Sequence, residues 1–93
     1  MKSISTIEIK EFKINNTLQP SDTYIPTAQL YITKLIVDGA AGTKYTVAYE
    51  HMVQVRLLTE PPRNIKNIKI NNVEYTHIKY DYNNKIIKGT RYA

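Results

Sequence analysis

The chain has 93 residues, no cysteine and a formal net charge of +5. A chain of this length forms a single domain, residues 1–93, with a modest core, and without cysteine it has neither disulfides nor thiolate metal ligands. No apolar run approaches the roughly 20 residues that cross a bilayer, and the polar, alternating N-terminus does not resemble a signal peptide. We therefore expect a protein that is not exported and has no contact with a membrane.

Positive charge gathers in the last third of the chain. Up to Glu60 the acidic residues balance the Lys and Arg residues, so the whole excess lies after that residue. Such a local positive field attracts polyanions or an acidic protein surface. The candidate residues for this contact are Lys66, Lys69, Lys79, Lys85, Lys88 and Arg91.

The N-terminal segment predicts two short extended stretches. Ile7 and Ile9 share one parity, and Phe12 and Ile14 share the other. A change of parity is typical of a β-bulge, which we expect near Lys10–Glu11.

Residues 17–26, TLQPSDTYIP, contain two prolines and predict a long loop. Long loops in a compact domain often contact a partner. Asp22 and Tyr24 are therefore candidates for a contact between subunits.

The next segment, residues 27–37, fits two periods. Ala28, Leu30 and Ile32 alternate as in a strand, but a helical i, i+3, i+4 stripe also runs from Ala28. The high content of β-branched residues favours a strand, and a short helix within 27–37 is the alternative. The sequence DGAAG at 38–42 then predicts a flexible turn.

The clearest signal is the alternation in residues 45–57. The large side chains at every second position are Tyr45, Val47, Tyr49, His51, Val53, Val55 and Leu57. This period predicts one strand, or two collinear strands, with one side buried. His51 belongs to that row, so we interpret it as a framework residue. Arg56 lies on the opposite face and is a candidate for an ion pair between subunits.

The segment Glu60–Arg63 interrupts the pattern, because its two prolines cannot donate to a strand ladder. After it, alternating stretches predict a three-strand meander that turns at Asn71–Asn72 and again at 83–84. The tetrapeptide KINN at 13–16 returns at 69–72, but the residues that follow differ, so we attribute the echo to composition. The whole chain predicts an all-β, mainly antiparallel fold, either a small β-barrel or a sandwich.

The sequence has little that is typical of a catalytic site or a metal site. Zinc needs three or four Cys, His, Asp or Glu ligands, and His51 and His77 are the only histidines among scattered acids. The serines lack a nucleophile-elbow sequence, and DGAAG lacks the lysine of a phosphate-binding loop. We expect no enzyme activity, no metal and no cofactor.

Lysines interleaved with tyrosines in the last third are typical of sequence-tolerant single-strand binders. The tyrosines are Tyr75, Tyr80, Tyr82 and Tyr92. Lysines on the solvent face of a sheet equally protect an edge against aggregation, so both interpretations stay open.

Two stretches, GTKYTVAYEHMVQVRL at 42–57 and IKINNVEYTHIKYD at 68–81, carry spaced motifs. The matching residues are Gly42, Tyr45 and Ala48, then His51, Val53, Val55 and Arg56, then Ile70, Tyr75 and Ile78. In this order they resemble the small head-closure, or head–tail joining, proteins of tailed bacteriophages. Asn71–Asn72 stands where that family has a hairpin glycine, and the spacer between Ala48 and His51 is short.

The resemblance implies a β-barrel-like subunit of the virion neck, made in the host cytoplasm. Such subunits form a homo-oligomeric ring, expected here to be dodecameric or to match the tail symmetry, beneath the portal and its adaptor. The ring completes the DNA channel, holds the genome in and docks the tail, with non-specific contact to double-stranded DNA. Two other interpretations remain: a small basic β-barrel that binds nucleic acid, and a phage-encoded inhibitor that covers a surface of a host protein.

Overall fold

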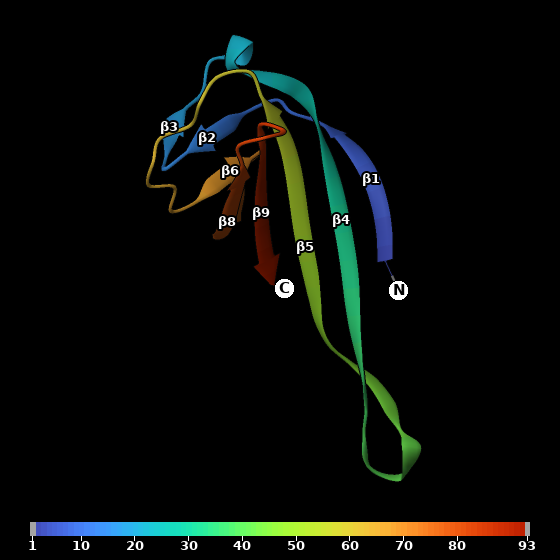
Figure 1. Ribbon diagram of the computed structural model, residues 1–93. Coiled ribbons are helices and arrows are strands. Elements are labelled where there is room, and N and C mark those ends of the chain that lie inside the picture. Colours follow the sequence, from blue (N-terminus) through green and yellow to red (C-terminus); the bar gives the residue numbers. More distant parts are fainter. Residues whose placement is uncertain (1, 93) are drawn as a thin grey trace.

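The computed structural model describes residues 2–92, and their side chains except those of residues 2, 3, 35–37 and 46–48. Every regular element in this range is a strand or a single 3-10 turn, and all paired strands are antiparallel (Figure 1). The predicted all-β, mainly antiparallel fold is confirmed. The alternative of a short helix within 27–37 is wrong, because one long strand runs through that segment.

Five strands form a large sheet in the spatial order β1-β4-β5-β9-β8. They are β1 (Lys2–Glu8), β4 (Tyr24–Asp38), β5 (Lys44–Leu57), β9 (Ile86–Tyr92) and β8 (His77–Asp81). The 3-10 turn η2 (Ala40–Gly42) joins β4 to β5.

Four short strands form a second sheet in the order β3-β2-β6-β7. They are β3 (Thr17–Leu18), β2 (Phe12–Ile14), β6 (Ile68–Ile70) and β7 (Val73–Tyr75). The 3-10 turn η1 (Ser21–Thr23) leads from this sheet into β4. Both sheets are open, so of the two predicted forms the closed barrel is wrong and the two-sheet form is the one observed.

The two sheets share one core at one end of the large sheet. Its buried side chains are Ile9, Phe12, Ile14, Tyr24, Ala28, Val53, Val55, Leu57, Ile68, Ile70, Tyr75 and Ile87. The rings of Phe12 and Tyr24 meet edge to face at 5.0 Å, a favoured arrangement for aromatic pairs. Gly89 in β9 lets the large sheet approach Ile68 and Tyr75 of the small one.

The alternation in residues 45–57 does form one strand, β5, but only its second half is buried. Val53, Val55 and Leu57 are at most 3% exposed, whereas Tyr45 and Tyr49 of the same row are 52% and 39% exposed. The two tyrosines lie where the strand leaves the core. Val47, also assigned to the buried row, falls among the residues whose side chains are not described.

Two predictions about connections are wrong. No bulge occurs near Lys10–Glu11, because the chain leaves the large sheet after β1 and enters the small one at β2. The register irregularities instead lie between β4 and β5. The predicted loop at 17–26 is shorter than expected, since it begins in β3, contains η1 and ends where β4 starts at Tyr24.

The predicted C-terminal meander is also wrong. The four strands of the last third form two hairpins that belong to different sheets, β6–β7 in the small one and β8–β9 in the large one. The chain crosses between the sheets at Thr76, where period-two patterning continues without interruption. The turns themselves fall at the two predicted places, and Asn71 and Asn72 both adopt positive φ, as a type I′ hairpin turn requires.

The KINN echo marks a structural repeat, contrary to our attribution to composition. Residues 8–16, EIKEFKINN, and 64–72, NIKNIKINN, differ only at the first, fourth and fifth positions. Strands β2 and β6 pair antiparallel with Lys13 opposite the equivalent Lys69, so a local two-fold axis passes between them. Asn15 and Asn16 adopt the same positive φ as the second pair and turn β2 into β3.

The side chain of the first asparagine of each pair forms hydrogen bonds to the backbone of the other copy of the repeat. Asn71 Oδ1 accepts hydrogen bonds from the backbone N–H groups of Lys10 (2.7 Å) and Glu11 (3.1 Å), and its Nδ2 donates to the carbonyl of Glu8 (2.9 Å). Asn15 makes the equivalent bonds to Lys66 N (2.7 Å), Asn67 N (3.3 Å) and Asn64 O (2.6 Å). We call these two side chains the asparagine clasps.

Candidate functional site

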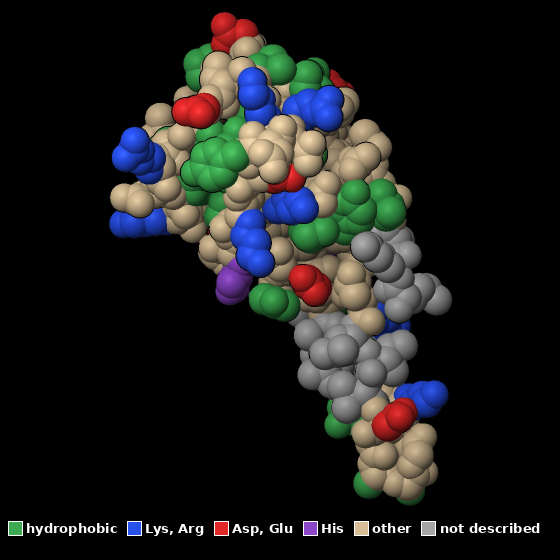
Figure 2. Space-filling model, in the orientation of Figure 1, with side chains coloured by type: hydrophobic (Ala, Val, Ile, Leu, Met, Phe, Trp, Pro, Cys, Tyr) green, Lys and Arg blue, Asp and Glu red, His purple; other side chains and the backbone are tan. Residues whose placement is uncertain are grey.

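The most distinctive surface is a two-stranded ribbon that projects from the body. β1 ends its pairing with β4 at Lys2 opposite Thr33, and β9 ends its pairing with β5 at Tyr92 opposite Glu50. Beyond these pairs β4 and β5 continue alone, so residues 34–49 form a free hairpin, which we call the arm (Figure 1). Figure 2 shows it as a narrow projection from the rounded body.

The arm accounts for the elongated shape of the molecule. The extents are 53 × 26 × 25 Å, and the radius of gyration is 15.2 Å, against about 12 Å for a compact domain of this length. The two strands of the arm, residues 34–38 and 44–49, span about 17–20 Å at the usual rise per residue. The tip is closed by η2, with Ala41 and Gly42 at positive φ.

The sequence of the arm is mainly apolar. It reads KLIVDGAAGTKYTVAY and carries charge only at Lys34, Asp38 and Lys44. Among its described side chains, the large apolar Tyr45 and Tyr49 are exposed. A two-stranded hairpin is marginally stable by itself in water.

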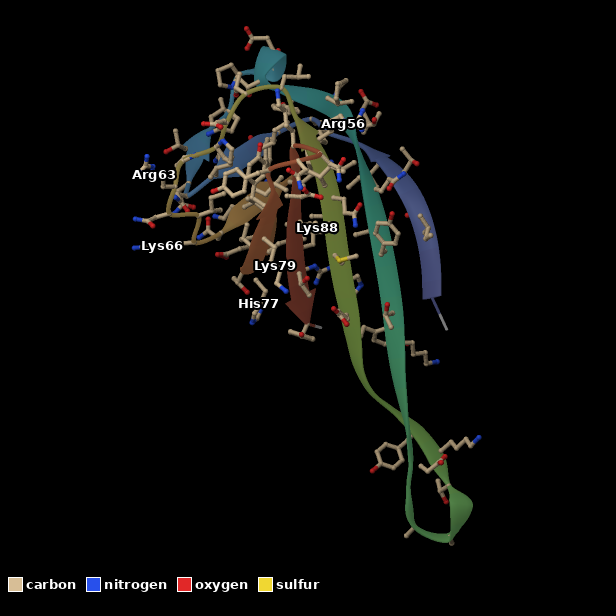
Figure 3. The ribbon with its side chains drawn as sticks, viewed as in Figure 1. Arg56, Arg63, Lys66, His77, Lys79 and Lys88 are labelled. Atoms are coloured by element: carbon tan, nitrogen blue, oxygen red, sulfur yellow. The ribbon has the colours of Figure 1, made fainter. Side chains whose placement is uncertain are left out.

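The predicted cationic residues do not form one patch. Lys79 in β8 and Lys88 in β9 lie directly opposite each other on the outer face of the large sheet, and Lys85 lies in the turn between those strands. Lys69 lies in β6 of the small sheet and Lys66 in the loop before that strand, so neither belongs to the large sheet (Figure 3 labels Lys66). Sequence patterning could not separate the two groups, because it did not reveal that the chain changes sheets.

Arg91 differs from the other predicted cations. It shares its face of β9 with Ile87 and Gly89, so it points to the inner side of the large sheet. Its guanidinium carbon lies 5.9 Å from the centre of the Tyr75 ring, within cation–π range.

Neither Lys79 nor Lys88 forms an ion pair among the described side chains, although the charge of Lys88 acts on the nearby Asp81. Among the described side chains the only ion pair joins Lys13 to Glu11, at 3.4 Å. Like charges directly opposite on a sheet are destabilising. The two lysines border an open hollow of about 680 Å³ that His77, Tyr92 and the acid Glu50 also line.

The three candidates for contacts between subunits have different positions. Arg56 is exposed on the outer face, opposite to the buried row, as predicted. Asp22 is exposed in η1. Tyr24 is only 5% exposed and packs on Phe12, so its position does not support a contact with a partner.

The two histidines lie on opposite faces of the large sheet. His51 pairs with Arg91 on the inner face, and His77 pairs with Thr90 on the outer face. Within the described residues no three His, Cys, Asp or Glu side chains gather as a metal site would require. No helix in the described part of the chain is long and apolar enough to cross a bilayer.

His51 has an unusual environment for a framework residue. Its Nδ1 is buried without a hydrogen-bond partner, and so is Nε of the neighbouring Arg91. Burial and then the positive charge of Arg91 lower the pKa of His51 below its ordinary value of 6.5. The sequence did not reveal this pairing, because the two residues are far apart along the chain.

A pH dependence of stability follows from this lowered pKa. Because the unfolded chain binds the proton more readily than the folded one, the contribution of His51 is fully present above about pH 6.5. It is lost as the pH falls from there toward the lower pKa of the folded state. We expect the free energy of unfolding to decrease between pH 7 and pH 5 more steeply in the wild type than in a His51→Gln variant. Urea unfolding followed by circular dichroism measures both slopes, and His77→Gln controls for loss of an imidazole elsewhere. Equal slopes in all three proteins would contradict the expectation.

Comparisons of the chain with protein-family models, with curated protein sequences and with solved structures find no match.

Proposed function

We propose that the protein is a non-enzymatic structural subunit that assembles with copies of itself through the arm, as a ring in the neck of a tailed-phage virion. The observation that carries the proposal is the arm, an apolar ribbon of residues 34–49 with both edges unpaired. Unpaired strand edges are templates for pairing with another chain, so the arm is suited to contact a neighbour.

The small size of the core supports assembly. One side of the sandwich is a sheet of strands only two or three residues long, and a chain of 93 residues buries a modest fraction of its surface by itself. An arm that packs on the next subunit adds buried area without enlarging the fold. Because arm and acceptor are different surfaces, the contact is heterologous and repeats from copy to copy until the ring closes.

The motifs that resemble head-closure proteins occupy the arm and the core together. Gly42 and Tyr45 lie at the tip of the arm, and His51 lies where β5 enters the body. Tyr75 is in the core at the end of β7. The resemblance therefore follows the strand that connects the arm to the core.

The outer face of the large sheet supports the expected partners. The facing lysines Lys79 and Lys88 suit the phosphate backbone of DNA in a channel, or an acidic surface of a portal, adaptor or tail protein. Nothing in this arrangement reads base edges, which is consistent with non-specific contact.

The experiment compares the oligomeric mass of the wild type with that of an armless variant by size-exclusion chromatography with light scattering. In the variant, Asn-Gly replaces residues 35–48 and joins the facing residues Lys34 and Tyr49 with a type I′ turn. We expect a wild-type oligomer at high concentration and a folded, monomeric variant. Tyr82→Ser, which removes a 71% exposed tyrosine from the body, is the control and should assemble normally. An armless variant that assembles like the wild type, or a wild type that stays monomeric, contradicts the proposal.

The same measurement with double-stranded and single-stranded DNA tests the main alternative, a small nucleic-acid-binding protein. The facing lysines favour this candidate. It is supported if a monomer binds DNA with steep salt dependence, if armless protein binds equally well, and if Lys79→Glu with Lys88→Glu abolishes binding. A monomer that does not bind DNA would favour the remaining alternative, an inhibitor that covers a surface of a host protein.

A further inference from the structure

The inner face of the large sheet contains a small polar niche at the base of the arm. His51 and Arg91 lie directly opposite each other in β5 and β9, just beyond the part of the sheet that the core covers. His51 Nδ1 and Arg91 Nε are both buried, and neither has a hydrogen-bond partner among the described residues. We call this pair, with the Tyr75 ring beneath the guanidinium, the niche.

Unpartnered buried nitrogens of this kind call for an explanation. Buried polar groups in folded proteins almost always have a partner, and a charged group without one is costly. Nearby on the same face, Lys34 Nζ lies 6.0 Å from the centre of the Tyr49 ring, which adds a further cation at the start of the arm. Among the described residues no carboxylate is paired with His51, Arg91 or Lys34. The two unpartnered nitrogens are covered, but the side chains of Arg91 and Lys34 are only partly buried, so their positive charges can meet a carboxylate at the surface.

We propose that the niche binds the carboxylate of Asp38 from the arm of a second copy of this chain. This inference rests on the proposed function, since it specifies where the arm docks. Asp38 is the only acid of the arm and lies exposed at its tip, opposite Lys44. An arginine–carboxylate contact can be bidentate and is among the stronger hydrogen-bonded pairs in proteins.

The positions of donor and acceptor suit a chain of contacts. The tip and the niche lie at opposite ends of a ribbon about 17–20 Å long, so one subunit can present its tip to one neighbour while its niche accepts the arm of another. The exposed rings of Tyr45 and Tyr49 would then pack along the neighbouring subunit. Asp38 would fix the position of the arm along the neighbouring subunit, because its carboxylate meets the cations of the niche in only one alignment.

The test is an exchange of charges between two variants. Asp38→Arg places a cation at the tip against Arg91, and Arg91→Glu places an acid in the niche against Asp38. Each variant alone is expected to raise the dissociation constant for self-association at least about tenfold, because like charges then meet in the contact.

An equimolar mixture of the two variants is expected to recover assembly close to that of the wild type. In an alternating ring the altered arm of the Asp38→Arg chain meets the altered niche of the Arg91→Glu chain, so their charges are opposite. At the next contact the unchanged Asp38 of the second chain meets the unchanged Arg91 of the first. Every contact in the mixed ring therefore joins an acid to a cation.

Sedimentation velocity measures the association of each variant and of the mixture. Glu60→Arg and Arg63→Glu, which make the same charge changes at exposed positions away from the niche, are the controls and should assemble like the wild type. Recovery on mixing also shows that neither variant is misfolded.

The possible failures separate this inference from the proposed function. If both variants assemble like the wild type while the armless variant stays monomeric, the arm mediates assembly and the niche is not its acceptor. If both variants lose assembly but the mixture does not recover it, the pairing of Asp38 with Arg91 is wrong. If the wild type itself does not assemble, both proposals fail.

Discussion

Gly89→Val is expected to lower the free energy of unfolding by about 3 kcal/mol, at the upper end of the usual cost of overpacking a core. A Cβ atom at this position would lie 2.8 Å from Cβ of Tyr75 and 2.9 Å from Cδ1 of Ile68. The first of these atoms is fixed to the backbone of β7, so a side-chain rotation cannot relieve the contact. Valine would force the two sheets apart where they meet most closely.

Urea unfolding at neutral pH measures this loss. Thr90→Val, on the outer face of the same strand, places a valine there by exchanging a hydroxyl for a methyl group of similar size, and should change the free energy by less than about 0.5 kcal/mol. A Gly89→Val protein as stable as the wild type would show that the sheets do not pack as closely as described. Since a domain of this size has a stability of about 5–14 kcal/mol, the variant should still fold at low temperature.

Asn71→Ala is expected to have a comparable effect, a loss of about 3 kcal/mol. The variant removes three hydrogen bonds, each contributing about 0.5–1.5 kcal/mol, and leaves the N–H groups of Lys10 and Glu11 without this partner. It also places alanine at a φ of 52°, where a residue with a Cβ is strained.

Two further variants separate these causes. Asn71→Gly keeps the left-handed turn and removes only the side-chain hydrogen bonds. It should therefore lower the free energy of unfolding by less than Asn71→Ala does. Asn72→Gly, at a φ of 69° and with no side-chain bond described, should be close to neutral. Because Asn15 occupies the equivalent position in the repeat, Asn15→Ala should lower the free energy of unfolding by about as much as Asn71→Ala. If Asn71→Ala is no more damaging than Asn72→Gly, the clasp does not stabilise the fold.

The clasps also have a structural consequence for the small sheet. Asn71 holds the corner at which the chain leaves β1 for the small sheet, and Asn15 holds the loop before β6. Asn71 therefore ties the small sheet to the end of β1 in the large sheet, whereas Asn15 ties the turn after β2 to the loop that leads into β6.

Much of the local structure could be predicted from the sequence. The alternation around His51 indicates a strand because side chains in an extended chain alternate between faces, a property of the strand alone. Asn71–Asn72 indicates a tight turn because asparagine tolerates positive φ. The exposed position of Arg56 follows from the same alternation.

The site was less predictable. Tyr24 was assigned to a loop because two prolines surround it, yet it begins a strand and fills the core beside Phe12. The repeat around Asn15 and Asn71 is hidden by the residues that follow KINN, which differ, whereas the similarity extends upstream, where the partners of the clasps lie.

The sequence by itself determined that this chain is built of strands, where several of them turn and which side chains of a strand share a face. Only the tertiary structure decided which strands pair, that the last third divides between two sheets, and that β4 and β5 outrun their neighbours to form the arm. The physical reason is that alternation and turn geometry depend on neighbouring residues, whereas strand pairing depends on contacts between residues far apart in the chain. The opposition of His51 to Arg91, and the separation of Lys79 from Lys66, follow from pairing alone.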